Sequence, residues 1–429
     1  MLLRPKPAPE RGSRGFFQSR RTIVNLGSLA SIQVSNAFAP LIAYPFVLAM
    51  VGQESFAQIV VAEAIALFLL SFVLYSFEVD GVASVVGLKD GDHRSLSRIF
   101  TSIMILRLAF YCGGLSILQI ALTFTHPELR SLVFGWSLVS LSYALQPNWL
   151  FQGLERNFPL AVFVTLSRFS ALATVFFFVR SESDAILLPF ILGGWYVAGA
   201  IGALTYSVVA FNIRPVSVDI RQLASLVWKG KEVYLNSVAT SFYKDSNILI
   251  LSILGVPAAG IASYSLAEKL TKAFQASMRP LNQLFFPRAL AIASEEVRPS
   301  PRAFKRIVAI TSPQMAVALF LLSMGAVTYM LFAPYVAALE KVEGLDVVFQ
   351  LTLIMALSVL PGVGVFMLGI AGLNALGERG YMLRALMIAG MFSLTLNLAL
   401  VPYFGELASA VCFLVSEILL FVLIVRRYR

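Results

Sequence analysis

The chain has 429 residues, of which 58% are hydrophobic and only 13% are charged, and its mean hydropathy is +0.81. These values lie outside the range of soluble globular domains, so the composition indicates a chain that folds in a lipid bilayer. The formal net charge of +10 does not indicate a nucleic-acid partner, because the basic residues lie in short connections between apolar stretches rather than on one folded face.

The chain opens with a basic segment, residues 1–21, which contains six Lys or Arg residues. This segment has no apolar core of signal-peptide length, and the apolar stretch that follows is long enough to remain in the membrane. We therefore expect no cleavage. Because positively charged segments are retained on the cytoplasmic side, we also expect a cytoplasmic basic tail.

Apolar stretches of about 20 residues recur along the whole chain, and each is long enough to cross a bilayer core. They must be helical, because lipid cannot satisfy exposed backbone groups. The sequence therefore predicts an all-α polytopic membrane protein with about twelve spans. Their expected ranges are 22–50, 56–79, 97–124, 129–147, 159–180, 185–211, 224–254, 257–288, 306–333, 347–375, 381–402 and 404–425.

The expected spans divide into two groups of six, with the charged segment 212–222 as the linker between an N-terminal lobe, 22–211, and a C-terminal lobe, 223–429. An even number of spans returns the short basic C-terminus to the cytoplasm. The outer loops of this topology hold only Arg130, Arg180 and Lys341, whereas the cytoplasmic loops hold many bases, as the positive-inside rule predicts. Two six-helix halves with the site between them are a known transporter plan.

Ionisable side chains deep inside predicted spans are the most informative signal. Each costs roughly 2.5 to 3.5 kcal/mol to insert at the centre of a helix, so such residues face a partner or a water-filled cavity. We expect the bases to bind substrate and the acids to couple ion movement to transport. The bases are Arg107, Arg168, Lys244, Lys269, Lys272 and Arg279, and the acids are Glu63, Asp245, Glu268 and Glu417.

The helical period places Glu268, Lys272 and Arg279 on one polar stripe of the eighth span. Lys244 of the seventh span reaches a similar depth, and a salt bridge from Lys244 to Glu268 is expected. Ion pairs that only hold helices together are an equally good interpretation of any single pair.

Arg107 and Arg168 favour an anionic ligand more clearly, because the first half offers few deep acids beyond Glu63. Glu78 and Asp80 are expected at a solvated helix end. Because guanidinium groups match phosphate geometry, the sequence predicts a cationic cavity that receives a pyrophosphate group or acidic sugars.

Signals for an enzyme or a cofactor are weak. Cys112 and Cys412 both fall in apolar segments without metal-like spacing, so we interpret them as buried small hydrophobic residues. His93 and His126 fall in loops, and no arrangement of Ser, His and Asp suggests a nucleophile. The sequence therefore predicts a protein that is not an enzyme and uses no cofactor.

Three segments resemble the Wzx-like oligosaccharide flippases of the polysaccharide biosynthesis family, within the multidrug/oligosaccharidyl-lipid/polysaccharide exporter superfamily. The connection Asn148–Phe169 contains Trp-Leu-Phe-Gln-Gly-Leu-Glu, which fits the family's pattern after the fourth helix. The first span, which contains prolines, leads to a turn at Gly52 to Phe56. The run Leu266–Leu290 is similar to the family's eighth helix, in which an acid and a base open the segment.

This resemblance implies a fold of the multidrug and toxin extrusion (MATE) type, in which two six-helix lobes surround a central cavity. It also implies the substrate, an undecaprenyl-pyrophosphate-linked oligosaccharide that alternating access moves across the bacterial inner membrane for O-antigen, capsule or exopolysaccharide assembly. Expected partners are the lipid bilayer, a polysaccharide polymerase and chain-length proteins. The aromatic segments 15–18 and 148–152 are expected at the cytoplasmic interface, where aromatic rings anchor membrane proteins.

Two other functions remain open from the sequence alone. An ion-coupled exporter of small organic cations fits the same fold, but it favours an acidic cavity, whereas the deep bases outnumber the deep acids in this chain. A membrane polymerase or ligase needs a large outer loop with reactive groups, and the longest outer loop expected, residues 334–346, is short.

Overall fold

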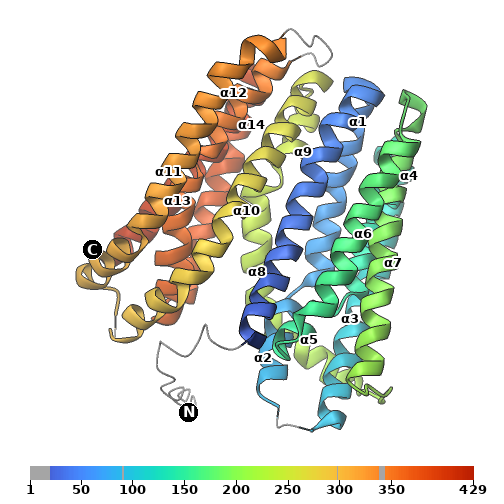
Figure 1. Ribbon diagram of the computed structural model, residues 1–429, viewed down its shortest axis with the longest axis vertical. Coiled ribbons are helices and arrows are strands. Elements are labelled where there is room, and N and C mark those ends of the chain that lie inside the picture. The colour runs from blue at the N-terminus through green and yellow to red at the C-terminus, as the bar shows by residue number, and fades with distance from the viewer. Residues whose placement is uncertain (1–19, 89–90, 297, 338–343) are drawn as a thin grey trace.

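The structure, a computed structural model, describes residues 20–88, 91–296, 298–337 and 344–429, and every regular element within them is a helix. The prediction of an all-α polytopic chain is confirmed. The long helices lie side by side in an elongated bundle (Figure 1). The helices of the first half are α1 (Arg20–Leu74), α2 (Phe77–Val86), α3 (His93–Thr125), η1 (Pro127–Leu129), α4 (Arg130–Leu145), α5 (Asn148–Gly153), α6 (Asn157–Phe178), η2 (Glu182–Asp184) and α7 (Leu187–Ala210). Those of the second half are α8 (Ile220–Lys244), α9 (Asn247–Ile253), α10 (Ala258–Ser294), α11 (Pro301–Ala337), α12 (Leu345–Ala356), α13 (Val359–Gly364), the π-helical η3 (Val365–Leu373) and α14 (Arg379–Tyr428).

Among the described residues, seven helices are long and apolar enough to span a membrane. Two of these, Gly27–Val86 and Arg379–Tyr428, contain 60 and 50 residues, which at 1.5 Å per residue is enough to cross a bilayer twice. Each bends at a glycine with left-handed backbone geometry, Gly52 at φ 78° and Gly405 at φ 56°. Glycine adopts this conformation without the steric cost that a Cβ brings. Gly52 lies in the predicted junction between spans 22–50 and 56–79, and Gly405 lies two residues after the predicted junction at residue 403.

The predicted spans 129–147, 224–254 and 257–288 are also helical, but they do not meet the same test of length and hydropathy. Helix α4 has only 16 residues, whereas α8 and α10 contain half of the deep ionisable residues. The predicted span 224–254 is interrupted at Asp245 and Ser246, where α8 ends and α9 begins. The seventh predicted span is therefore two helices rather than one.

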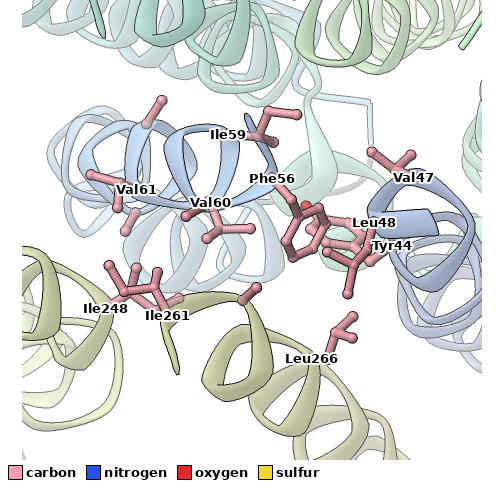
Figure 2. Packing of buried hydrophobic residues seen from close by; sticks show 14 of the residues in the cluster. Tyr44, Val47, Leu48, Phe56, Ile59, Val60, Val61, Ile248, Ile261 and Leu266 are labelled. Carbon is pink, nitrogen blue, oxygen red and sulfur yellow. The ribbon is translucent and has the colours of Figure 1, made fainter. Parts of the chain in front are cut away.

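The buried apolar residues form a core shared by both halves of the chain at one end of the bundle. This shared core combines residues 43–196 with residues 248–413. Figure 2 shows Ile248 and Ile261 of the second half beside Val60 and Val61 of α1, with Leu266 near Tyr44. Gly52, the α9–α10 turn and Gly405 all lie at this end, which we call the shared-core end.

At the opposite end the cores are separate. One large cluster is built from residues 77–213, and another from residues 239–428. Both ends of the described chain and the loops rich in Lys and Arg lie here, so we call it the basic end. In Figure 1 the orange and red helices of the second half lean away from the blue and green helices toward this end.

Toward the basic end, the two halves also touch where the last turns of α1 and Tyr75 pack against α8. We call this contact the α1–α8 seam. The rings of Tyr75 and Tyr234 stack with their centroids 4.6 Å apart, and the Tyr75 hydroxyl donates to the Val227 carbonyl over 2.9 Å. Ser71 and Ser241 lie with their hydroxyl oxygens 3.4 Å apart. The halves therefore touch along α1 and α8 while their basic-end cores are separate.

Candidate functional site

The polar stripe predicted on α10 exists, and it is linked to the end of α8. Lys272 Nζ lies 2.7 Å from Glu268 Oε1, one helical turn away, and 3.0 Å from Asp245 Oδ1. Asp245 takes part because it is the first residue after α8, where the chain breaks before α9. One lysine is therefore shared by two carboxylates.

The predicted salt bridge from Lys244 to Glu268 is wrong. Lys244 Nζ instead lies 3.5 Å from Glu417 Oε2, whose side chain is 2% exposed in α14. Neighbouring residues on a helix diverge by about 100°, so Lys244 and Asp245 face different helices. The acid of α14 could not be placed beside α8 from the sequence, because this contact depends on how distant helices pack.

A third pair joins the two halves of the chain. Lys269 Nζ lies 2.7 Å from Glu63 Oε1, and both side chains are largely buried. The same ammonium group lies 4.7 Å from the ring centroid of Tyr44, a favourable distance for a cation over an aromatic face. Glu63 and Tyr44 belong to α1, whereas Lys269 belongs to α10. This ion pair therefore bridges the halves next to the shared core.

Arg107 has an acidic partner, contrary to the sequence-based prediction. Its side chain is fully buried, Nη2 lies 2.5 Å from Glu78 Oε1, and Nη1 donates to the carbonyls of Tyr143 and Gln146 over 3.2 and 3.1 Å. These carbonyls lie at the carboxyl end of α4, where backbone acceptors lack helical partners. Arg107 thus secures a helix end, and Glu78 is not the solvated boundary group that was expected.

Glu78 reaches Arg107 because the chain reverses between α1 and α2. Tyr75 adopts a left-handed conformation, φ 47°, and α2 then begins at Phe77. A residue other than glycine in this region marks a turn that its surroundings enforce. A helix continuing through residue 79, as the sequence predicted, would have directed Glu78 elsewhere.

Arg168 differs from Arg107, the other deep base of the first half. Its side chain is almost completely buried in α6, and Nε donates to Asn36 Oδ1 over 2.9 Å. The guanidinium carbon lies 3.2 Å from the ring centroid of Tyr196 in α7. Within the described part of the chain, no carboxylate lies within 4.0 Å of this guanidinium. Neutral groups therefore hold Arg168 in place and leave its charge uncompensated.

Arg279 of α10 is a second deep base for which the described residues provide no ion pair. It donates a hydrogen bond to Gln33 Oε1 of α1. Gln33 and Asn36 are three residues apart, so they lie on the same face of α1. One helix face thus holds two guanidinium groups, Arg168 from the first half and Arg279 from the second.

Three neutral residues that orient these bases, Gln33, Asn36 and Tyr196, were not predicted from the sequence. Nor was a contact between buried amides, in which Asn397 of α14 donates to Asn247 of α9 over 3.3 Å. Amides inside apolar spans are themselves a signal, because each must find a partner in a medium that offers few. Searching for amides as well as charges would have found Gln33 and Asn36.

The aromatic motif after α4 has a structural role. Trp149, Leu150 and Phe151 are completely buried in the protein, so residues 148–152 do not anchor the chain at the lipid interface as expected. Helix α5 packs on α2 so closely that a Cβ on Gly81 would lie 2.9 Å from the Trp149 ring. The other aromatic segment, residues 15–18, lies outside the described residues.

A family model described as "Polysaccharide biosynthesis protein" matches residues 23–292, which is more than half of the chain. The chain belongs to this family. A protein of Escherichia coli (strain K12) named "Putative O-antigen transporter" is 25% identical over 403 residues, which cover 92% of this chain and 94% of the relative. A protein of the same name from Shigella dysenteriae is 22% identical over 408 residues, which cover 92% and 97%.

The fold matches that of solved MATE transporters. A mutant of the Vibrio cholerae MATE transporter VcmN superposes with a TM-score of 0.53 over 95% of both chains, at 15% sequence identity. The MATE-like fold implied by the family resemblance is therefore confirmed. Together with family membership, it makes the chain a multi-pass membrane protein of polysaccharide biosynthesis, and it agrees with the expectation that the chain is not an enzyme.

Proposed function

We propose that this chain is a flippase that moves undecaprenyl-pyrophosphate-linked oligosaccharides across the bacterial inner membrane by alternating access. The observation that supports the proposal most directly is the convergence of Arg168 and Arg279 on one face of α1, each without a carboxylate within 4.0 Å among the described residues. Two such guanidinium groups match a pyrophosphate, because each binds phosphate oxygens in pairs and stays charged. The curated relatives named "Putative O-antigen transporter" support the same class of cargo.

In this mechanism the sugars and the pyrophosphate enter the space between the halves, while the polyprenyl chain stays in lipid. Transferring charged and hydroxylated groups through hydrocarbon would leave them without partners, so a polar path lowers the barrier. The shared core would close this path at one end, and the separate cores would leave it open at the basic end. We assign the basic end to the cytoplasm by the positive-inside rule, with both termini there.

We propose that the acids Glu63, Asp245, Glu268 and Glu417 couple ion movement to transport through their lysine partners. Each is paired with a lysine at 2.7 to 3.5 Å. Protonating such an acid would remove the negative charge that now faces the ammonium group of Lys244, Lys269 or Lys272. These lysines would therefore be free to bind substrate only when their partner acids are protonated. Arg168 and Arg279 would be available whether or not the acids are protonated.

We also propose how the chain is organised and which proteins it works with. The lobes are residues 22–211 and 223–429, joined by the cytoplasmic linker 212–222 and preceded by the basic tail 1–21. A polysaccharide polymerase and chain-length proteins would receive the product on the outer side. Export of small organic cations is less consistent with the site, because each of these four acids is already paired with a base.

The test is the leaflet distribution of lipid-linked oligosaccharide in cells that lack this gene. The gene is restored as wild type, as Arg168→Ala, or as the exposed control Arg221→Ala, with protein levels matched. Accumulation on the cytoplasmic leaflet, relieved by wild type and Arg221→Ala but not by Arg168→Ala, is expected. Normal surface polysaccharide in the deletion strain, together with altered resistance to organic cations, would contradict the proposal and favour the exporter.

A further inference from the structure

A cavity of about 520 Å³ lies at the basic end, away from Arg168 and Arg279. It is formed where the first turns of α1 and α6 meet the last turns of α7. The lining residues are Val24, Asn25, Glu155, Arg156, Phe158, Pro159 and Tyr206. No part of the proposed transport mechanism uses this cavity.

The cavity wall is held in place by one amide of α1. Asn25 Oδ1 accepts a hydrogen bond from the Asn157 backbone N–H over 3.1 Å, and Asn25 Nδ2 donates to the Glu155 carbonyl. Glu155 itself has a left-handed backbone, φ 51°, which costs roughly 1 to 2 kcal/mol for a residue with a Cβ. The Asn25 contacts fix this turn and hold two charged residues side by side at the rim.

Those two residues, Glu155 and Arg156, are exposed, and neither belongs to an ion pair among the described residues. The Arg156 guanidinium lies 5.8 Å from the Phe211 ring centroid, which orients it without neutralising it. Below them, Val24 and Phe158 present exposed apolar side chains. The cavity therefore combines one positive and one negative group with an apolar wall.

We propose that this cavity binds a zwitterionic phospholipid whose headgroup ends in a primary ammonium, such as phosphatidylethanolamine. Arg156 would bind the phosphate, and Glu155 would accept hydrogen bonds from the ammonium. An acyl chain would lie along Val24 and Phe158. An anionic phospholipid fits less well, because it leaves Glu155 unpaired beside a negative charge. A choline lipid also fits less well, because its trimethylammonium has no N–H to donate.

The bound lipid would brace the two helices that hold the uncompensated arginine. Further along the same helices, Ser35 bonds to Thr165 over 3.1 Å and Asn36 bonds to Arg168 over 2.9 Å. A headgroup fixed between the first turns of α1 and α6 would limit their separation. This role does not depend on the identity of the transported cargo.

The proposal is tested by native mass spectrometry of the purified full-length chain with equal amounts of phosphatidylethanolamine, phosphatidylcholine or phosphatidylglycerol of the same acyl chains. Wild type is expected to bind phosphatidylethanolamine several-fold more tightly than the other two. Glu155→Gln should lose the preference over phosphatidylcholine, and Arg156→Gln should weaken binding of phosphatidylethanolamine about tenfold, as expected for loss of one charge-assisted hydrogen bond.

The matched control is Glu296→Gln with Arg298→Gln, an acid and a base two residues apart at the same end of the bundle, outside the cavity. This control should bind lipid like wild type. Melting temperatures with and without phosphatidylethanolamine provide a second measurement, in which only chains with an intact cavity should be stabilised. Equal binding of the ethanolamine and choline lipids by wild type, stronger binding of phosphatidylglycerol, or the same loss in the control would each overturn the proposal. Because lipid binding is measured without transport, failure here leaves the proposed function untouched.

Discussion

The two fully buried arginines of the first half differ in the charge of the groups that hold them. A carboxylate and two backbone carbonyls surround Arg107, whereas an amide and a tyrosine ring hold Arg168. Both contacts satisfy hydrogen bonds or orient the guanidinium plane, but only the first cancels its charge. We therefore expect Arg168, rather than Arg107, to attract an anion.

Replacing Arg168 with lysine should therefore reduce transport even though the charge is kept. The lysine ammonium lacks the planar fork that contacts Asn36 and stacks on Tyr196, and it cannot bind two phosphate oxygens in parallel. We expect affinity for the lipid-linked pyrophosphate to fall about 10- to 100-fold, the range for loss of a charge-assisted hydrogen bond. Binding of the purified chain to a lipid pyrophosphate measures this. Unchanged affinity in Arg168→Lys would show that point charge alone suffices.

Replacing Glu78 with glutamine should instead affect stability. The substitution leaves the Arg107 guanidinium buried without its counter-charge, a change that costs about 3 to 5 kcal/mol when no water reaches the site. Glu78 is 29% exposed, so we expect the lower end of this range. Equilibrium unfolding in detergent measures the loss. The double variant with Arg107→Met should recover most of it, and a double variant as unstable as Glu78→Gln would exclude the pair as the cause.

The residue types and depths of the charged groups could be predicted from the sequence, but their partners could not. Glu268 and Lys272 are four residues apart on one helix, so local geometry was enough. Glu78 with Arg107, Glu63 with Lys269, and Lys244 with Glu417 each join different helices. Those pairings depend on helix packing and on the reversal at Tyr75, neither of which has a local signature.

At the scale of elements, the contact between α2 and α5 explains the aromatic motif. Gly81 leaves room for the Trp149 ring, and a Cβ on Gly153 would lie 2.8 Å from Val85 Cβ. Without a hydrophobic driving force between helices in lipid, such close approach of small residues is a main source of association. The motif thus builds the turn that presents Glu155 and Arg156.

Gly81→Val should destabilise the chain by about 1 to 3 kcal/mol, the usual cost of overpacking. The double variant Gly81→Val with Trp149→Leu should recover part of the lost stability, because leucine is smaller than the Trp149 ring. Gly113→Ala in α3 is the matched control, because a Cβ there meets nothing within 4 Å and improves helix propensity. Thermal unfolding compares the three. Equal losses for Gly81→Val and Gly113→Ala would contradict the close-packing argument.

The stability of the first turn of α3 should depend on pH, because the residue that caps this helix is Asp92. Hydrogen bonds from the Ser95 hydroxyl and backbone N–H hold the pKa of Asp92 below its usual value. The pKa of Asp92 is lower in the folded chain than in the unfolded chain, so the charged cap stabilises α3 fully at pH values above the unfolded-state pKa. This stabilisation is lost as the pH falls through the folded-state pKa. Amide exchange at residues 95–98 should be faster in Asp92→Ala than in wild type at neutral pH, and equal in acid. A difference that persisted in strong acid would argue against a charged cap.

The predicted elements agree closely with the structure where apolar stretches are long and uninterrupted. The expected span 159–180 is α6 at 157–178, and the span 185–211 contains α7 at 187–210. The errors occur where polar residues interrupt the helix, as at Asp245, or where the chain reverses between two helices, as at Tyr75. Hydropathy measures how apolar a segment is, and it does not report a local change in φ and ψ.

For the whole molecule, the proposed alternating access predicts which contacts between the halves break during transport. The shared core and the Glu63–Lys269 pair join the halves at one end, while the α1–α8 seam joins them along Tyr75 and Tyr234. Opening the shared-core end would require the shared core and the Glu63–Lys269 pair to separate. The seam can persist in both states and act as a hinge. The division into lobes at residues 212–222 stays a prediction.

Linking the two halves across the shared core should therefore stop transport. We expect Val61→Cys with Ile261→Cys, at two positions that lie near each other in the shared core (Figure 2), in a chain without Cys112 and Cys412, to lose activity when joined by a short bis-methanethiosulfonate linker. Activity should return on reduction, because this linker is attached through disulfides. The control is Ser71→Cys with Ser241→Cys, whose native hydroxyl oxygens lie 3.4 Å apart at the hinge seam. This second link should be tolerated. Transport that continued with positions 61 and 261 joined would mean that the shared-core end does not open.

The uncompensated pair Arg168 and Arg279 also has an electrical consequence. A transported pyrophosphate with two negative charges would neutralise both guanidinium groups, so, apart from any coupled ion, the loaded site would cross the field without net charge. The empty carrier would return with two positive charges, and each is worth about 2.3 kcal/mol per 100 mV of field actually crossed. A membrane potential that is negative inside would then draw the empty site back toward the cytoplasm, so voltage would drive the return step and not the loaded one.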